Sequence, residues 1–83
     1  SNLPLIKIKS KNLNNKITII DLIILSKLEN SKSEVRRLIK GNAIKIDDRI
    51  VNDEKFTIDV HLFNKNYLKL SIGKKRHFKI EFN

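Results

Sequence analysis

Basic and hydroxyl side chains recur at helical spacing in residues 31–40, Ser-Lys-Ser-Glu-Val-Arg-Arg-Leu-Ile-Lys. At about 100° per residue, the basic positions and one serine fall in an arc of roughly 140° beside the apolar stripe of the predicted helix. Such an arc can donate several hydrogen bonds to phosphate oxygens, and arginine can bind them in a bidentate manner. It favours phosphate binding over the alternative of a solvated charged face. The arc comprises Lys32, Ser33, Arg36, Arg37 and Lys40.

Other basic residues and the overall charge point to the same chemistry. The 83 residues include 18 Lys and Arg against 9 Asp and Glu, which gives a formal net charge of +9. This excess attracts polyanions and favours a nucleic acid or an anionic membrane surface, although a merely solubilising surface remains an alternative. The basic residues outside the arc include Lys7, Lys9, Lys45 and the cluster Lys74, Lys75 and Arg76 at a predicted hairpin tip.

Residues that could support catalysis or hold a cofactor are scarce. The two histidines, His61 and His77, are not spaced as metal ligands, and the two glycines form no phosphate-binding loop. The chain has no cysteine, which excludes thiolate zinc sites and disulfides. The paired acids Asp47 and Asp48 fall at a predicted turn. We therefore expect no catalytic residue, no metal site, no cofactor and no small-molecule substrate in this chain.

The first predicted helix covers residues 18–28, where apolar residues recur three and four positions apart. Thr18 is the expected N-cap, and Asp21 places a negative charge in the first turn, where it complements the helix dipole. Leu22, Leu25 and Leu28 widen the apolar stripe, so this helix should be largely buried.

The second predicted helix begins at Ser31, and Glu34 three residues later completes a capping box. Its apolar face contains Val35, Leu38 and Ile39, and Gly41 or Asn42 should supply a left-handed C-cap. The core-facing residues fix the rotation of this helix and turn the basic arc outward.

Alternating apolar residues predict strands at 3–9 and 55–60 and a hairpin over 44–51. Pro4 is tolerated only at the start of the first strand or on a sheet edge. Asp47-Asp48 is the predicted turn of the hairpin. The last two predicted strands are joined by a turn at Gly73-Lys74-Lys75. The first of them has Leu68, Leu70 and Ile72 on one face, and the second has Phe78, Ile80 and Phe82 on one face. We predict an α+β fold of two antiparallel helices packed on a small, mostly antiparallel sheet.

A chain of 83 residues has room for one domain and one modest core. We expect residues 1–16 to form a linker and first strand, and 17–83 to form the domain. No apolar run approaches the roughly 20 residues of a membrane span, so no membrane partner is expected. The chain does not begin with Met, which suggests a fragment of a longer protein. Tyr67 is a candidate stacking residue for bases.

The segment Ser31 to Lys40, followed by Ile44-Lys45-Ile46 and Asp47-Asp48, resembles the helix-turn-strand signature of the S-four (alpha-L) RNA-binding domain. The usual signature is Ser-Lys-Ser-Glu-Ala-Arg-Arg-Leu-Ile, then Gly-Gly, then Val-x-Val-Asn-Gly. The flanks Asp21-Leu22-Ile23, Gly73-Lys74-Lys75 and Phe78-Lys79-Ile80 make the chain similar to the C-terminal domain of bacterial-type tyrosyl-tRNA synthetases over nearly its whole length. The chain departs from the signature in having Asn42-Ala43 for the glycine pair, Asp47-Asp48 for Asn-Gly, and Lys27 for a helix-ending glycine.

The resemblance implies an S-four-like fold and a cytoplasmic module that binds tRNA, in particular tRNA-Tyr, away from the acceptor end. The parent chain would be a tyrosine-tRNA ligase and a homodimer, whereas this fragment would be monomeric and not an enzyme. ATP and Mg²⁺ are implied only for the absent catalytic domain. The residues expected to contact RNA are Ser31, Lys32, Ser33, Arg36, Arg37, Lys40, Lys45, Lys74, Lys75 and Arg76.

Two other readings remain open. The chain could be the S-four domain of another RNA-modifying enzyme, such as a pseudouridine synthase. It could also be a structural or protein-interaction appendage. A steep salt dependence of tRNA affinity would separate RNA binding from the second of these, since phosphate contacts release counterions.

Overall fold

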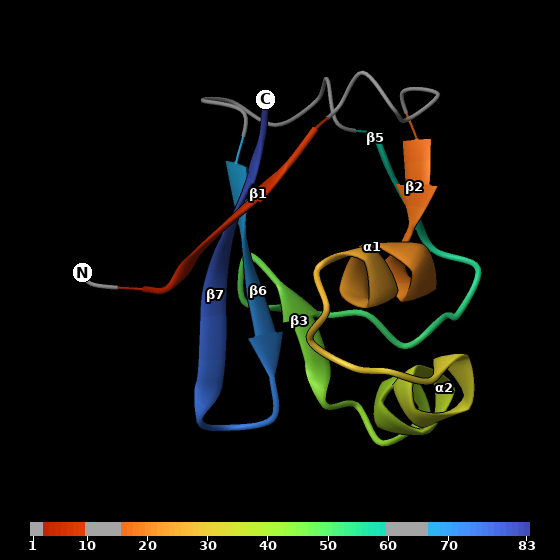
Figure 1. Cartoon of the computed structure of the whole chain (residues 1–83). Helices are drawn as coiled ribbons and strands as arrows, with labels where there is room; N and C mark the ends of the chain where they lie inside the picture. Colours follow the sequence, from red (N-terminus) through yellow and green to blue (C-terminus); the bar gives the residue numbers. More distant parts are fainter. Residues whose placement is uncertain (1–2, 10–15, 60–66) are drawn as a thin grey trace.

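The computed structural model describes residues 3–9, 16–59 and 67–83. Two helices lie on one side of a twisted five-stranded sheet, in a two-layer α+β arrangement (Figure 1). The elements are β1 (Leu5–Ile8), β2 (Lys16–Thr18), α1 (Ile19–Leu25), α2 (Lys32–Lys40), β3 (Ile44–Ile46), β4 (Arg49–Ile50), β5 (Thr57–Asp59), β6 (Tyr67–Ile72) and β7 (Arg76–Phe82).

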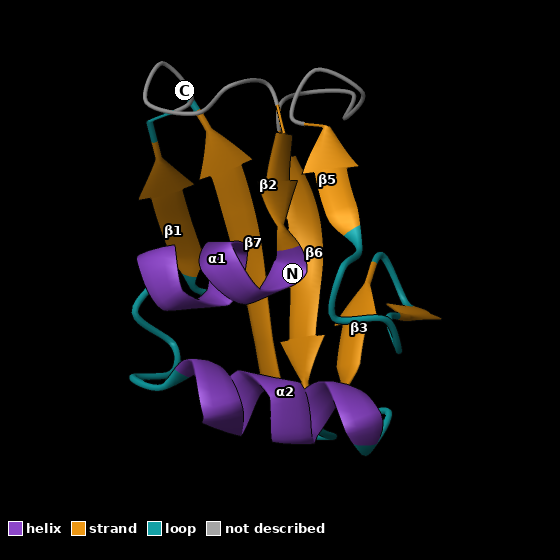
Figure 2. Ribbon diagram, turned by 90° about the vertical axis from the view of Figure 1, so that its right-hand side faces the viewer, coloured by secondary structure: helices purple, strands orange, loops and turns teal. Residues whose placement is uncertain are grey.

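The main sheet has the strand order β1-β7-β6-β3-β4, and β2 pairs with β5 in a separate two-stranded sheet. Every pairing is antiparallel except that of β1 with β7, which is parallel. The two helices run in opposite directions along one face of the sheet (Figure 2), and the residues described after position 41 form no further helix. The predicted α+β fold with a mostly antiparallel sheet is therefore confirmed.

The core lies between the helices and one face of the sheet. Leu68, Leu70 and Ile72 alternate along β6 and are buried, as predicted from their spacing. Opposite them, α1 contributes Leu22 and Ile23, and α2 contributes two further buried residues. No helix covers the other face of the sheet in the part of the chain that the structure describes.

Helix α1 begins as predicted but ends earlier. The Oγ1 of Thr18 accepts a hydrogen bond from the backbone N of Asp21 at 3.1 Å, which confirms the N-cap. The helix stops after Leu25, because Lys27 adopts a left-handed backbone conformation with φ 62°. The expectation that Leu25 would be buried was wrong: this side chain is 50% exposed. Leu28 lies beyond the helix and packs against the core from the connection.

Helix α2 begins at the predicted cap, with Ser31 Oγ accepting from the backbone N of Glu34 at 3.4 Å. The reciprocal half of the capping box is not formed, because the Glu34 carboxylate accepts hydrogen bonds from the Arg37 guanidinium instead. At the other end, Asn42 takes the left-handed conformation with φ 59°, while Gly41 does not. Asparagine tolerates this conformation better than most residues with a side chain.

The predicted hairpin of β3 and β4 turns at Asp47 and Asp48, which have φ values of 49° and 69°. Two consecutive positive φ angles are the requirement of a type I′ turn. The turn is also fastened to β6: Asp47 Oδ1 accepts from the backbone N of Lys69 at 2.9 Å, and Asp48 Oδ1 lies 3.0 Å from Lys69 Nζ. These contacts give the pair of aspartates a structural role that the turn signal alone did not reveal.

The ion pair at this turn predicts a pH effect. A hydrogen bond from Lys69, together with its charge, lowers the pKa of the Asp48 carboxyl below its ordinary value. Asp48 therefore contributes stability above its unfolded pKa of about 4, and this contribution is lost as the pH falls through the folded value. An NMR titration of the carboxyl carbon should give a low pKa in the unaltered chain and an ordinary one in Lys69→Met. An equal pKa in both proteins would contradict the assignment.

Candidate nucleic-acid interface

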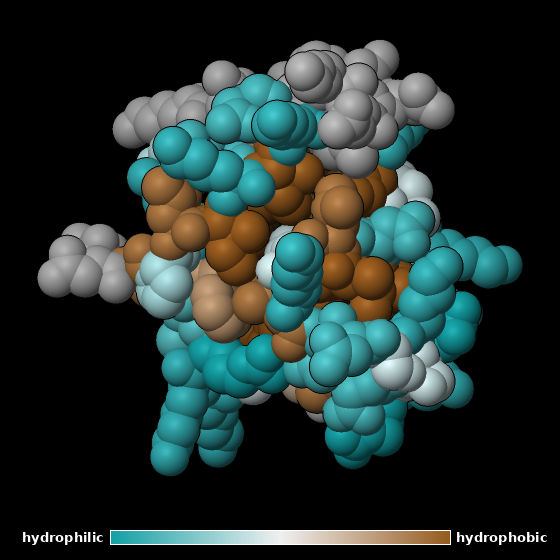
Figure 3. Space-filling view, in the orientation of Figure 1, coloured by the Kyte–Doolittle hydropathy of each residue, from teal (hydrophilic) through white to brown (hydrophobic). Residues whose placement is uncertain are grey.

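Helix α2 presents the predicted basic arc to solvent. Val35 and Ile39 are 0% and 1% exposed, so they fix the rotation of the helix against the core. The five residues of the arc are all exposed as a consequence, as the spacing predicted. Hydrophilic side chains gather at the lower end of the molecule, over α2 and the turn between β6 and β7 (Figure 3).

Three of the four cations of the arc lie beside acidic residues. Arg36 Nε is 3.7 Å from Glu54 Oε1, and Arg37 Nε donates to Glu34 Oε2 at 3.0 Å. Lys32 Nζ is 3.8 Å from Asp21 Oδ1. Exposed pairs of this kind contribute little to stability, so a phosphate can replace the carboxylate at little cost. The i,i+3 spacing of Glu34 and Arg37 is visible in the sequence, whereas the other two pairs join separate segments of the chain. All three partners reduce the net charge of the arc.

The hydrogen bond from Arg37 lowers the pKa of the Glu34 carboxyl, and Glu34 in turn raises the pKa of Arg37. Both groups are therefore charged at neutral pH. The Arg37 guanidinium is mostly exposed despite this pairing. It is held in place on the helix surface and still accessible to a larger anion.

The turn between β6 and β7 is attached directly to the C-terminal end of α2. The backbone N of Gly73 donates to the carbonyl oxygen of Ala43 at 2.7 Å, and Ala43 N donates to Leu38 O at 3.0 Å. This connection places the β6–β7 turn, which contains Lys74 and Lys75, at the same end of the molecule as α2 (Figure 1). Two clusters that are far apart in the sequence thus lie on adjoining surfaces.

Arg76 differs from its neighbours Lys74 and Lys75. Its Nη1 is 2.7 Å from Glu29 Oε2, and its Nη2 donates to the Leu28 carbonyl oxygen at 2.8 Å. These bonds tie the start of β7 to the connection between the helices. For Arg76 to contact RNA as predicted, one of these two hydrogen bonds would have to be replaced by a bond to the RNA.

Lys45 and Tyr67 lie on the sheet face opposite the helices, in β3 and β6. Lys45 is exposed, whereas the Tyr67 ring is half-buried with Lys79 Nζ 4.1 Å from its centroid. One face of the predicted stacking residue is therefore covered by a cation–π contact. His77, expected on a solvent face, is half-buried and hydrogen-bonded, and His61 lies outside the described residues.

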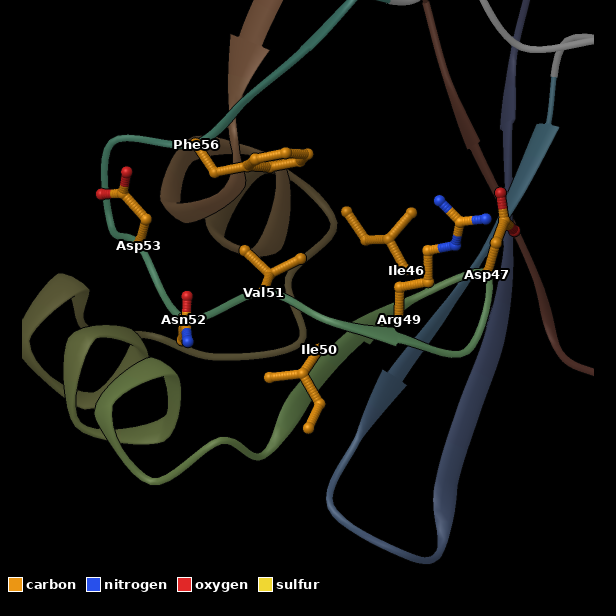
Figure 4. Close-up of a pocket in the computed structure, with 8 residues that line it drawn as sticks. All are labelled: Ile46, Asp47, Arg49, Ile50, Val51, Asn52, Asp53 and Phe56. Carbon is orange, nitrogen blue, oxygen red and sulfur yellow. The ribbon is translucent and has the colours of Figure 1, made fainter.

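An apolar groove of about 570 Å³ lies beside the β3–β4 hairpin. Phe56, Val51 and Ile46 form its inner wall, and the Arg49 side chain runs along Ile46 (Figure 4). Ile50 and Phe56 are among the exposed large apolar residues of the chain. The groove is a surface feature that the sequence pattern did not predict, because no alternation distinguishes these residues from core residues.

Two kinds of site are missing from the described part of the chain. No described helix is long and apolar enough to cross a membrane. The described residues also contain no group of three or more histidine, cysteine, aspartate or glutamate side chains that could hold a metal ion.

A family model, the Tyrosine--tRNA ligase SYY-like C-terminal domain, matches residues 1–80. The chain belongs to this family. The tyrosine--tRNA ligase of Pelagibacter ubique (strain HTCC1062) is 58% identical over 80 residues, which cover 96% of this chain and 20% of that protein. The tyrosine--tRNA ligase of Rickettsia massiliae (strain Mtu5) is 46% identical over 77 residues, 92% of this chain and 19% of that protein. The chain spans about one fifth of the length of these relatives.

This member of the tyrosine--tRNA ligase C-terminal family keeps a left-handed backbone where the signature has glycine or Asn-Gly. Lys27 and Asn42 have positive φ angles, as do both residues of the Asp47-Asp48 turn. A residue with a side chain pays roughly 1 kcal/mol for this conformation. At these four positions residues with a side chain therefore adopt the conformation that glycine or asparagine favours.

Proposed function

We propose that this chain is the tRNA-binding C-terminal module of a tyrosine-tRNA ligase and that it binds the RNA backbone through α2 and the β6–β7 turn. The observation that carries the proposal is the outward-facing basic arc of α2, whose rotation Val35 and Ile39 determine. Family membership supports tRNA as the polyanion.

The relatives' name supports a parent enzyme that joins tyrosine to its tRNA, with tRNA-Tyr as the specific partner. In this division of labour the present chain holds the tRNA away from the acceptor end and carries no catalytic residue. The chemistry with ATP and Mg²⁺ belongs to the remainder of the parent chain, which would be a cytoplasmic homodimer. The contacts proposed for this chain are made by Ser31, Lys32, Ser33, Arg36, Arg37, Lys40, Lys45, Lys74, Lys75 and Arg76.

Titration of a tRNA-Tyr transcript with this chain, at several salt concentrations, tests the proposal. If each of the four cations of the arc neutralises about one phosphate, they contribute about −3 to −4 to the slope of log affinity against log salt, and the contacts proposed for Lys45, Lys74, Lys75 and Arg76 should make the slope steeper. The chain alone should not activate tyrosine in a pyrophosphate-exchange assay. Salt-independent binding would favour a protein-interaction appendage, and tyrosine activation by this chain would contradict the division of labour.

A further inference from the structure

A pocket of about 520 Å³, lined by both polar and apolar residues, opens on the sheet face opposite the helices, where β3, β6 and the β6–β7 turn meet. The register places Lys45 beside Ser71, and Ser71 beside His77, in one row across three strands. Lys74 approaches from the turn, and Asn42 approaches from the end of α2. Side chains from the end of α2, β3, β6, the β6–β7 turn and β7 therefore line one pocket.

The wall of this pocket is held rigidly by His77. Its Nε2 lies 2.9 Å from the Lys74 carbonyl oxygen, and its Nδ1 lies 2.9 Å from Ser71 Oγ. A carbonyl can only accept, so Nε2 donates to the Lys74 carbonyl oxygen, while Nδ1 shares a hydrogen bond with the serine hydroxyl. Ser71 is only 2% exposed, so its hydrogen bond to Nδ1 restricts the orientation of the imidazole ring. His77 thus positions the backbone of Lys74 at the pocket edge.

The charges around the pocket favour an anion. Lys45 and Lys74 form no salt bridge with the described acidic residues. The acid on the wall is Asp48, and its carboxylate is compensated by Lys69 Nζ at 3.0 Å. Lys45 lies close enough to Asp48 for their charges to interact without forming a salt bridge, and Lys74 forms no salt bridge with a described acidic residue.

We propose that this pocket binds a phosphodiester group of the RNA backbone through Lys45, Lys74 and the Asn42 amide. The proposal rests on the proposed RNA-binding function and extends the RNA-binding surface from α2 to the open face of the sheet. Asn42 follows directly on α2, and Gly73 N is bonded to Ala43 O, so the pocket continues the basic surface of α2 around the end of the sheet. RNA bound along α2 bends past the β6–β7 turn and contacts the face of the sheet that the helices leave open.

The variant Lys45→Ala/Lys74→Ala tests the pocket, and Lys16→Ala/Lys55→Ala is its matched control. Both variants remove two exposed lysines, but Lys16 and Lys55 lie outside the pocket. Loss of one phosphate contact removes about 0.9 from the salt slope, which corresponds to about eight-fold weaker tRNA binding at 0.1 M salt if the affinity at 1 M is unchanged. The control should lose less than about two-fold and keep its slope. Circular dichroism confirms folding, and Lys45→Gln/Lys74→Gln replaces any variant that does not fold.

The outcomes separate this proposal from the broader one. Equal losses in the pocket variant and the control would overturn the pocket, because the effect would then come from net charge alone. Unchanged binding by the pocket variant, with weaker binding by Arg36→Ala/Arg37→Ala, would overturn the pocket and leave RNA binding by α2 intact. If the unaltered chain shows no salt-dependent affinity for tRNA, the proposed function fails and the pocket fails with it.

Discussion

Replacing Arg36 and Arg37 together by alanine should weaken tRNA binding about 60-fold at 0.1 M salt. Two lost phosphate contacts remove about 1.8 from the salt slope, and at 0.1 M this corresponds to that factor when the affinity at 1 M is unchanged. Folding should be nearly unaffected, because both side chains are exposed and such substitutions usually change stability by less than about 0.5 kcal/mol. Fluorescence anisotropy at several salt concentrations measures the tRNA affinity and its salt slope.

Two controls define this result. Glu34→Gln/Glu54→Gln releases both arginines from their carboxylate partners and should strengthen binding several-fold, since two negative charges are removed beside the phosphates. Lys74→Ala/Lys75→Ala should weaken binding less than the arginine double variant if α2 dominates. An arginine double variant that is folded, with unchanged affinity and slope, would mean that the arc is only a solvated face.

Replacing Ile39 by alanine should have the largest effect on stability, a loss of about 2–5 kcal/mol in the free energy of unfolding. Ile39 is 1% exposed and belongs to the residues that hold α2 against the sheet. A domain of this size has a total stability of only about 5–15 kcal/mol, so the urea midpoint should fall steeply.

Size-matched variants test the cavity explanation. Ile39→Val should lose only about 0.5–1.5 kcal/mol, because it removes a single methylene. Leu25→Ala removes as many carbon atoms as Ile39→Ala, but from a residue that is 50% exposed, so it should cost clearly less. Equal losses for the Leu25 and Ile39 alanine variants would show that α2 is not fixed by the core contact described here.

The local features of the chain could be predicted because short-range chemistry determines them. Thr18 and Ser31 cap their helices through their own side chains, and the alternation of Leu68, Leu70 and Ile72 follows from the pleat of a strand. Helix α1 ends earlier than the apolar periodicity predicts, because periodicity alone does not reveal the left-handed conformation of Lys27. The signal that could have marked this end is the helix-ending glycine that the family signature has in place of Lys27.

Features that depend on contacts between distant segments could not be predicted. The partner of Arg36 is Glu54, which becomes its neighbour only when the chain beyond β4 folds back towards α2. The role of Asp47 as an acceptor for the backbone of Lys69 depends on the pairing of β3 with β6. The pocket on the open sheet face likewise requires the register of three strands. Helical periodicity predicts which residues form the arc on α2. It does not predict which acidic residues of other segments pair with them.

The parallel pairing of β1 with β7 joins segments from opposite ends of the sequence, with Leu5 opposite Lys79 and Ile8 opposite Phe82. Bringing such distant residues together costs more chain entropy than forming the neighbouring α1–α2 pair or the β3–β4 hairpin. During synthesis, β1 therefore stays without its partner until β7 has left the ribosome. The order of assembly places the helix that carries the basic arc early and the closing of the sheet edge last.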